Sequence, residues 1–160
     1  MPKPSLHRRV GLRYTEAVSM KVVASAPCTV SAAQCHPLYI SRPAAGFPAP
    51  GDDEVEQALD LNDLLIDNKE ATFFVRVEGD SMEGARIFSG DILVVDRSLR
   101  PLSGQIVVAA VYGEMVVKRA LVYHDRTELV SENPAYEPIV ISDPDACFIW
   151  GVAVGCVRVL

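Results

Sequence analysis

The chain has 160 residues, of which 49% are hydrophobic and 22% are charged, and its formal net charge is −6. This composition fits one folded domain with an additional segment, and it excludes a wholly disordered chain. No run of about 18 apolar residues occurs, so we expect neither an integral membrane protein nor a membrane partner. We also expect no signal peptide, because the small residues after Met20-Lys21 are interrupted by Pro27 and by polar side chains.

The charge is divided unevenly along the chain. Residues 1–45 carry six Lys or Arg and one acidic residue, whereas residues 46–160 carry nine Lys or Arg and twenty acidic residues. Because contacts to phosphate depend on Lys and Arg, we expect no direct sequence-specific DNA binding by the acidic part. The basic segment can either contact phosphate groups or lie on the acidic part of its own chain.

The cysteines and the metal-binding residue types form no known motif. Four cysteines occur, and their spacing matches neither a redox nor a zinc pattern, so we interpret them as free thiols of a protein in the reducing cytoplasm. The chain also has no glycine-rich phosphate loop and no cluster of His, Cys and Asp at metal-ligand spacing. We therefore predict neither a cofactor nor a metal.

The N-terminal third of the chain reads as irregular structure followed by short helices. Residues 1–45 show no sustained hydrophobic period, which indicates a flexible, extended arm. Three prolines and two glycines in residues 42–51 then exclude regular structure and indicate a linker. Asp52 and Asp53 predict the start of a helix over residues 54–59. Asp60 caps a second short turn, whose leucines at 61, 64 and 65 are available for the core.

From residue 72 onward the pattern is that of β-strands. Short segments rich in Val, Ile and aromatic residues alternate with glycines and other turn residues. The seven predicted strands cover residues 72–78, 92–96, 105–112, 115–123, 127–131, 138–142 and 147–159. Gly113-Glu114 predicts a tight hairpin between two of them. Seven strands with few helices predict a mainly β fold, built as a strongly curved antiparallel sheet or a β-barrel.

A lysine within an apolar strand is the first candidate for chemistry. After residue 45 the chain has two lysines, and Lys69 lies in a polar turn where we expect it to be solvated. Lys118 alternates onto one strand face with Val116, Ala120 and Val122. Burial lowers the pKa of a lysine, and a neutral amine is a competent general base. The alternative is an edge strand whose lysine reaches water.

The second candidate is a serine in a turn. Ser81 follows Gly79-Asp80 at the end of a predicted strand, where backbone N–H groups are free to form an oxyanion hole. Such a serine is most often structural. The one histidine after residue 45, His124, stands beside a predicted turn, and we interpret it as a surface residue rather than as the base of a Ser-His-Asp triad.

Residues 46–160 resemble the UmuD proteins, within the LexA-type serine–lysine self-cleaving peptidases. The resemblance lies in Gly79-Asp80-Ser81-Met82, residues 89–96, residues 104–109, residues 113–119, residues 133–139 and residues 148–159. The separation of 37 residues between Ser81 and Lys118 also suits the family. The resemblance implies the LexA/UmuD peptidase fold, Ser81 as the nucleophile, Lys118 as its base, and the backbone N–H groups of Asp80 and Ser81 as oxyanion donors.

The resemblance also implies the substrate and the partners. The cleaved bond is Ala45-Gly46, so that residues 1–45 are the arm that is removed and residues 46–160 are the peptidase and polymerase-accessory domain. Cleavage is slow until a RecA filament on single-stranded DNA binds. The product is a homodimeric, cytoplasmic accessory subunit of an error-prone Y-family DNA polymerase that performs translesion synthesis in the SOS response to DNA damage. The arm is longer than is usual in the family, and the start at Met1 or Met20 stays open.

Three other functions share parts of this pattern. A LexA-like or phage-type repressor inactivated by the same cleavage would need an N-terminal helix-turn-helix, for which residues 1–45 lack length and helical periodicity. A type I signal peptidase would need a membrane anchor. A binding module with a dead site would not need both Ser81 and Lys118.

Overall fold

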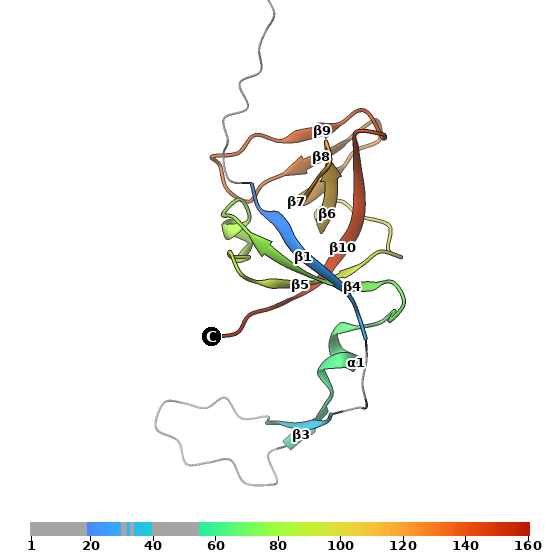
Figure 1. The fold of residues 1–160 in the computed structure, drawn as a ribbon, viewed down its shortest axis with the longest axis vertical. Coiled ribbons are helices and arrows are strands. Elements are labelled where there is room, and N and C mark those ends of the chain that lie inside the picture. Colours follow the sequence, from blue (N-terminus) through green and yellow to red (C-terminus); the bar gives the residue numbers. More distant parts are fainter. Residues whose placement is uncertain (1–18, 30–31, 33, 40–54) are drawn as a thin grey trace, which may run out of the picture.

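The computed structural model describes residues 19–29, 32, 34–39 and 55–160 (Figure 1). Within them, eight strands form one antiparallel sheet and two strands form a separate ribbon. The strands of the sheet are β1 (Lys21–Pro27), β4 (Thr72–Glu78), β5 (Ile92–Asp96), β6 (Ile106–Val111), β7 (Glu114–Val122), β8 (Thr127–Val130), β9 (Ile139–Ile141) and β10 (Cys147–Val157). The ribbon consists of β2 (His36–Tyr39) and β3 (Val55–Leu59).

The sheet closes into a barrel through its first strand. The strand order is β1-β4-β5-β10-β6-β7-β8-β9, and β1 also pairs with β7 where Lys21 lies opposite Val116. Six of the described strands therefore form a closed antiparallel barrel, and β8 and β9 continue the sheet beyond β7 (Figure 1). The predicted mainly β, barrel-like fold is confirmed. Closure leaves β4 and β7 paired on both sides near Lys21, where an open sheet would have edges.

The seven strands predicted after residue 72 all form, with boundaries that agree within two residues. The hairpin between β6 and β7 forms as well, but its two loop residues are Tyr112 and Gly113, one position earlier than predicted. Their φ angles are 48° and 86°, and a two-residue hairpin with both φ values positive matches the twist of its flanking strands.

The elements before residue 72 differ from the prediction. The helix expected over residues 54–59 is wrong: Val55–Leu59 is strand β3, because it pairs with β2 in a segment for which no strand was predicted. Asp60 does cap the helix α1 (Leu61–Leu65), and its carboxylate accepts a hydrogen bond from the Asn62 N–H at 2.8 Å. The leucines of α1 were expected in the core, yet Leu61 and Leu64 are exposed.

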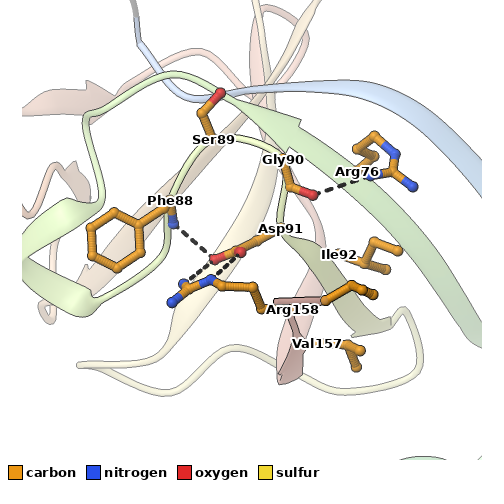
Figure 2. Close-up of a pocket in the computed structure, with 9 residues that line it drawn as sticks. Arg76, Phe88, Ser89, Gly90, Asp91, Ile92, Val157 and Arg158 are labelled. Carbon is orange, nitrogen blue, oxygen red and sulfur yellow. Dashed lines mark hydrogen bonds and ion pairs between the residues drawn. The ribbon is translucent and has the colours of Figure 1, made fainter.

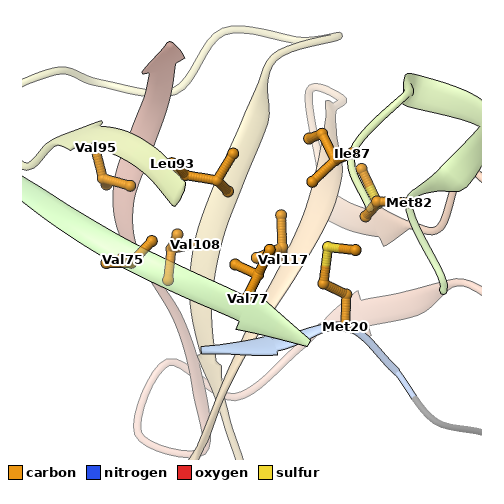
Figure 3. Close-up of a cluster of buried hydrophobic side chains, with 9 residues drawn as sticks. All are labelled: Met20, Val75, Val77, Met82, Ile87, Leu93, Val95, Val108 and Val117. Atoms are coloured by element: carbon orange, nitrogen blue, oxygen red, sulfur yellow. The ribbon is translucent and has the colours of Figure 1, made fainter. Parts of the chain in front are cut away.

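The barrel interior is packed with aliphatic side chains from most of its strands. One cluster of nine buried side chains is drawn in Figure 3 and consists of Met20, Val75, Val77, Met82, Ile87, Leu93, Val95, Val108 and Val117. Each such side chain contributes about 1.5–3 kcal/mol by leaving water. Met20 belongs to the segment that was predicted to be a flexible arm, so this part of the arm is part of the folded core. In the part of the chain that is described, no helix is long and apolar enough to cross a bilayer.

Candidate active site

Ser81 lies in the turn that follows β4. Gly79 adopts a φ of 118°, a conformation that is unfavourable for residues with a side chain. The chain turns at this glycine, just after the strand. Met82 enters the core, and the 3₁₀ turn Glu83–Ala85 follows it. Between them Ser81 is fully buried. The turn at Gly79 and the buried side chain of Met82 therefore hold Ser81 from both sides, which fixes the position of its hydroxyl.

Lys118 projects from the middle of β7 to the same place. Its side chain is 2% exposed, and its Nζ atom donates a hydrogen bond to the Ser81 Oγ at 2.8 Å. Of the two alternatives that the sequence left open for this lysine, burial is the one that the structure shows. The alternative of an edge strand is wrong, because β7 pairs with both β6 and β8.

The surroundings of Lys118 lower its pKa. Burial disfavours the ammonium form and lowers the pKa to about 8, although the negative charge of Asp80 acts in the opposite direction. Burial is the larger effect. At neutral pH the site therefore holds a population of neutral Lys118 that a solvated lysine would lack, and a neutral amine can accept a proton from Ser81.

The loop after β8 holds the serine turn from the other side. The Tyr136 hydroxyl donates a hydrogen bond to the Asp80 carboxylate, and the Asn133 side-chain amide donates to the Asp80 carbonyl at 3.2 Å. Partial burial, followed by the bond to Asp80, raises the pKa of Tyr136 to about 12, so its hydroxyl keeps its proton. The Tyr136 ring also lies 5.5 Å from the Lys118 Nζ.

Sequence reasoning missed this support of the serine turn. It assigned no side-chain role to Asp80, and it used Asn133 and Tyr136 only as part of a resemblance. The contacts join residues more than fifty positions apart. The only local signal was the Asn133-Pro134 turn, which indicates a loop but not what the loop contacts.

The arm contributes two residues to the site, and sequence reasoning missed both. The Met20 N–H donates a hydrogen bond to the Ser81 Oγ at 2.9 Å. The Lys118 Nζ donates a second hydrogen bond, to the Ser19 hydroxyl, at 2.6 Å. Both members of the Ser81–Lys118 pair are thus in contact with the arm.

The remaining candidates are placed as follows. Ala45 and Gly46 lie outside the described residues, so the cleavage bond stays a prediction. His124 is exposed, as expected of a surface residue, and Lys69 is also exposed. All four cysteines are free thiols. Across the described ranges, no group of His, Cys, Asp and Glu could hold a metal ion.

A hollow of about 550 Å³ lies elsewhere, at the start of β5 and the C-terminal end of β10 (Figure 2). Asp91 and Arg158 form a two-pronged ion pair there, with Nε–Oδ1 at 2.6 Å, and Asp91 also accepts from the Phe88 N–H at 2.8 Å. The hydrogen bonds from Arg158 hold the pKa of Asp91 at about 2. These bonds tie the chain end to the loop before β5, which is a structural role.

Comparison with known proteins identifies the class. The family description Peptidase S24-like matches residues 37–154. Protein MucA of Salmonella typhimurium is 44% identical over 118 residues, which cover 72% of this chain and 80% of MucA. Protein SamA of the same species is 45% identical over 116 residues, covering 72% and 80% of the two chains. The LexA repressor of Bordetella pertussis is 34% identical over 163 residues, covering 96% of this chain and 75% of the repressor.

The chain therefore belongs to the peptidase S24 family. This membership supports a serine peptidase of the LexA/UmuD type. Within that class the chain is similar to the UmuD-like proteins, among which are MucA, ImpA and SamA, and the recognised resemblance is confirmed. The family match begins at residue 37, so β1 and the residues that contact Ser81 and Lys118 from the arm lie outside it.

Proposed function

We propose that this protein is a self-cleaving serine endopeptidase in which Ser81 is the nucleophile and Lys118 is the general base. The observation that carries the proposal is the 2.8 Å contact between the Lys118 Nζ and the Ser81 Oγ inside the barrel. The lowered pKa of Lys118 supports the same assignment, because the base must be neutral to accept a proton.

The reaction follows from this pair. Neutral Lys118 accepts the hydroxyl proton of Ser81 while the Oγ atom attacks the carbonyl carbon of Ala45. The resulting Lys118 ammonium then gives its proton to the nitrogen of Gly46, so that the Ala45-Gly46 bond breaks and an ester joins Ala45 to Ser81. Water, deprotonated by Lys118, hydrolyses this ester and restores the free serine.

The negative charge that develops on the Ala45 oxygen needs donors. The backbone N–H groups of Asp80 and Ser81 donate no hydrogen bond to another described residue, so both are free to bind an oxyanion. The bonds from Tyr136 and Asn133 to Asp80 hold this stretch of backbone in place. We assign Tyr136 and Asn133 as positioning residues, since they act through Asp80.

We further propose that cleavage serves the SOS response. In this proposal a RecA filament on single-stranded DNA stimulates cleavage at Ala45-Gly46 in the cytoplasm. The trimmed homodimer then acts as the accessory subunit of a Y-family error-prone DNA polymerase. The support is the similarity to the UmuD-like proteins MucA, ImpA and SamA.

One experiment tests the peptidase and its trigger together. Purified protein is incubated with RecA, an ATP analogue and single-stranded DNA, and the intact mass and new N-terminus are determined. We expect a fragment that begins at Gly46, formed faster with the filament than without it, and no fragment from the Ser81→Ala variant. A fragment that begins elsewhere would remove the assignment of the cleavage bond.

A LexA-like repressor inactivated by the same cleavage is the second candidate. It is favoured by the match to the Bordetella pertussis LexA repressor, which covers 96% of this chain. The two functions separate in a gel-shift assay with the uncut protein and DNA from the promoter of its own gene. A repressor binds this DNA in preference to a scrambled sequence, whereas a polymerase accessory protein does not.

A further inference from the structure

β1 is a barrel strand that belongs to the segment removed by the proposed cleavage. It pairs with β4 over nearly its whole length, from Lys21 opposite Glu78 to Pro27 opposite Phe73. Beyond its ends, the Cys28 N–H donates to the Thr72 carbonyl at 3.0 Å, and the Val117 N–H donates to the Met20 carbonyl at 3.0 Å. The arm is therefore bound as a strand between β4 and β7.

Met20 anchors this strand next to the catalytic pair. Its side chain is fully buried and packs in the barrel core with Val77, Met82, Ile87 and Val117 (Figure 3). Met82 directly follows Ser81, and Val117 directly precedes Lys118. The methionine thus occupies an apolar position that is built from the same two stretches of chain that hold the nucleophile and the base.

The peptide bond between Ser19 and Met20 lies at the Ser81–Lys118 pair, called the dyad below, but it is not aligned for attack by Ser81. The Met20 N–H points at the Ser81 Oγ, at 2.9 Å, so the oxygen lies near the plane of that peptide group. A nucleophile must instead approach the carbonyl carbon from above that plane. The Ser19 hydroxyl meanwhile accepts a hydrogen bond from Lys118 at 2.6 Å. The segment engages both catalytic groups and presents neither with a reactive carbonyl.

We propose that residues 19–27 are a built-in pseudosubstrate strand that competes with the Ala45-Gly46 segment for the dyad. In the bound strand the small residue Ser19 lies at Lys118, and the Met20 side chain fills the adjoining apolar position. This inference rests on the proposed peptidase function. While β1 is seated, Ser81 and Lys118 are both occupied, and the Ala45-Gly46 bond reaches them only after the Ser19–Met20 end has left.

The occupancy of the site sets the expected size of the effect. If the seated strand leaves only a small fraction of molecules competent, then the observed cleavage rate is the intrinsic rate multiplied by that fraction. A change that weakens the binding of β1 at Ser81 and Lys118 raises both the fraction of competent molecules and the cleavage rate. Cleavage at Ala45-Gly46 would also separate β1 from the rest of the chain and leave the position between β4 and β7 without a covalently attached strand.

The test uses the full chain and two matched glutamate variants. Met20→Glu places a charge among the buried apolar side chains, whereas Val154→Glu places the same charge on an exposed side chain at the bulge of β10, outside the proposed pseudosubstrate strand. Without any activator, we expect Met20→Glu to form the Gly46 fragment at least about tenfold faster than wild type. We expect Val154→Glu to cleave at the wild-type rate. The rates are measured from intact masses over time.

Two further measurements separate loss of the Met20 contact from other effects of the added charge. Met20→Ala removes most of the buried side chain without adding a charge, and we expect it to accelerate cleavage less than Met20→Glu. A synthetic peptide of residues 18–28 is expected to slow cleavage of the Met20→Glu protein, whereas the same peptide with glutamate at position 20 is not. If neither Met20 variant cleaves faster than wild type, the pseudosubstrate is overturned.

The outcomes also separate this inference from the proposed function. A wild-type fragment that begins at Met20 would make residues 19 and 20 a substrate bond and overturn the inference, while supporting the peptidase. If the filament stimulates wild-type cleavage but the Met20 variants show no acceleration, only the pseudosubstrate fails. If the wild type is never cleaved, even with the filament, both proposals fail.

Discussion

The Nζ atom of Lys118 lies 2.8 Å from the hydroxyl oxygen of Ser81, although 37 positions separate the two residues in the chain. Ser81 is supplied by the turn after β4, and Lys118 by the middle of β7. These two strands are joined through β5, β10 and β6 on one side and through β1 on the other. The contact therefore exists only when the barrel is formed, and no linear motif contains it.

Replacing either member of this pair tests the assignment directly. We expect Ser81→Ala and Lys118→Met each to slow cleavage at Ala45-Gly46 by about a thousandfold or more, because nucleophile and base act as one unit. For the same reason the double variant is expected to be no slower than either single one. Intact mass measured over time in the presence of the filament gives the rates. Lys69→Met, which changes an exposed lysine, is the control and should cleave normally.

The pH dependence of cleavage reports the base. Since burial lowers the pKa of Lys118 to about 8, only the neutral fraction reacts, and that fraction rises with pH. We expect the rate to increase about tenfold per pH unit below 8 and to level off above it. The measurement is the single-turnover cleavage rate between pH 6 and 9.5. A flat or falling profile would exclude lysine as the base, and a midpoint near about 6.5 would point to a histidine.

Removing the charge of Asp80 tests in which direction this carboxylate shifts the pKa of Lys118. This charge raises the pKa of Lys118, in opposition to burial. Asp80→Asn removes the charge but keeps an oxygen that can accept the Tyr136 hydroxyl hydrogen bond. We therefore expect the midpoint of the pH–rate profile to move to lower pH in Asp80→Asn. Tyr136→Phe, which keeps the charge, should slow cleavage at all pH values. An unchanged or higher midpoint in Asp80→Asn would contradict the electrostatic argument.

The sequence predicted well those parts of the molecule whose signals are local. The strands from β4 to β10 carry runs of Val and Ile between turn residues, whereas the place of Lys118 in such a run left open whether its side chain is buried or reaches water. β1, β2 and β3 were missed because each depends on a partner distant in the chain. Lys21–Pro27 is held by β4, about fifty residues away, and most of its side chains are exposed. An exposed, mixed segment of this kind has no hydrophobic period to detect.

The site shows the same division between local and distant signals. Lys118 could be singled out because a lysine in an apolar strand is unusual in itself. A serine in a Gly-Asp turn is most often structural, and Ser81 was singled out only through the family resemblance. Tyr136 and Ser19, by contrast, lie in segments without a local sequence pattern that would mark them as functional. Only the folded structure brings the Tyr136 hydroxyl to Asp80 and the Ser19 hydroxyl to Lys118.

The close approach of two loops behind Ser81 provides a test through packing. The Gly84 N–H donates a hydrogen bond to the Glu132 carbonyl at 2.8 Å, and a Cβ atom at Gly84 would lie 2.5 Å from that same oxygen. Glu132 cannot easily give way, because its carboxylate accepts a hydrogen bond from the Arg119 side chain. Gly84→Ala must therefore push the serine turn and the loop after β8 apart.

We expect Gly84→Ala to lower the free energy of unfolding by about 1–3 kcal/mol, as is usual for overpacking of a closely packed position. Cleavage should slow by about tenfold or more, because a small displacement of Ser81 from Lys118 spoils the attack geometry. Urea denaturation and the cleavage rate measure the two effects. The control is Gly113→Asn, where a Cβ atom would meet nothing within 4 Å and where asparagine tolerates the positive φ. If Gly84→Ala matched wild type in both stability and rate, the contact with Glu132 would not position the serine turn.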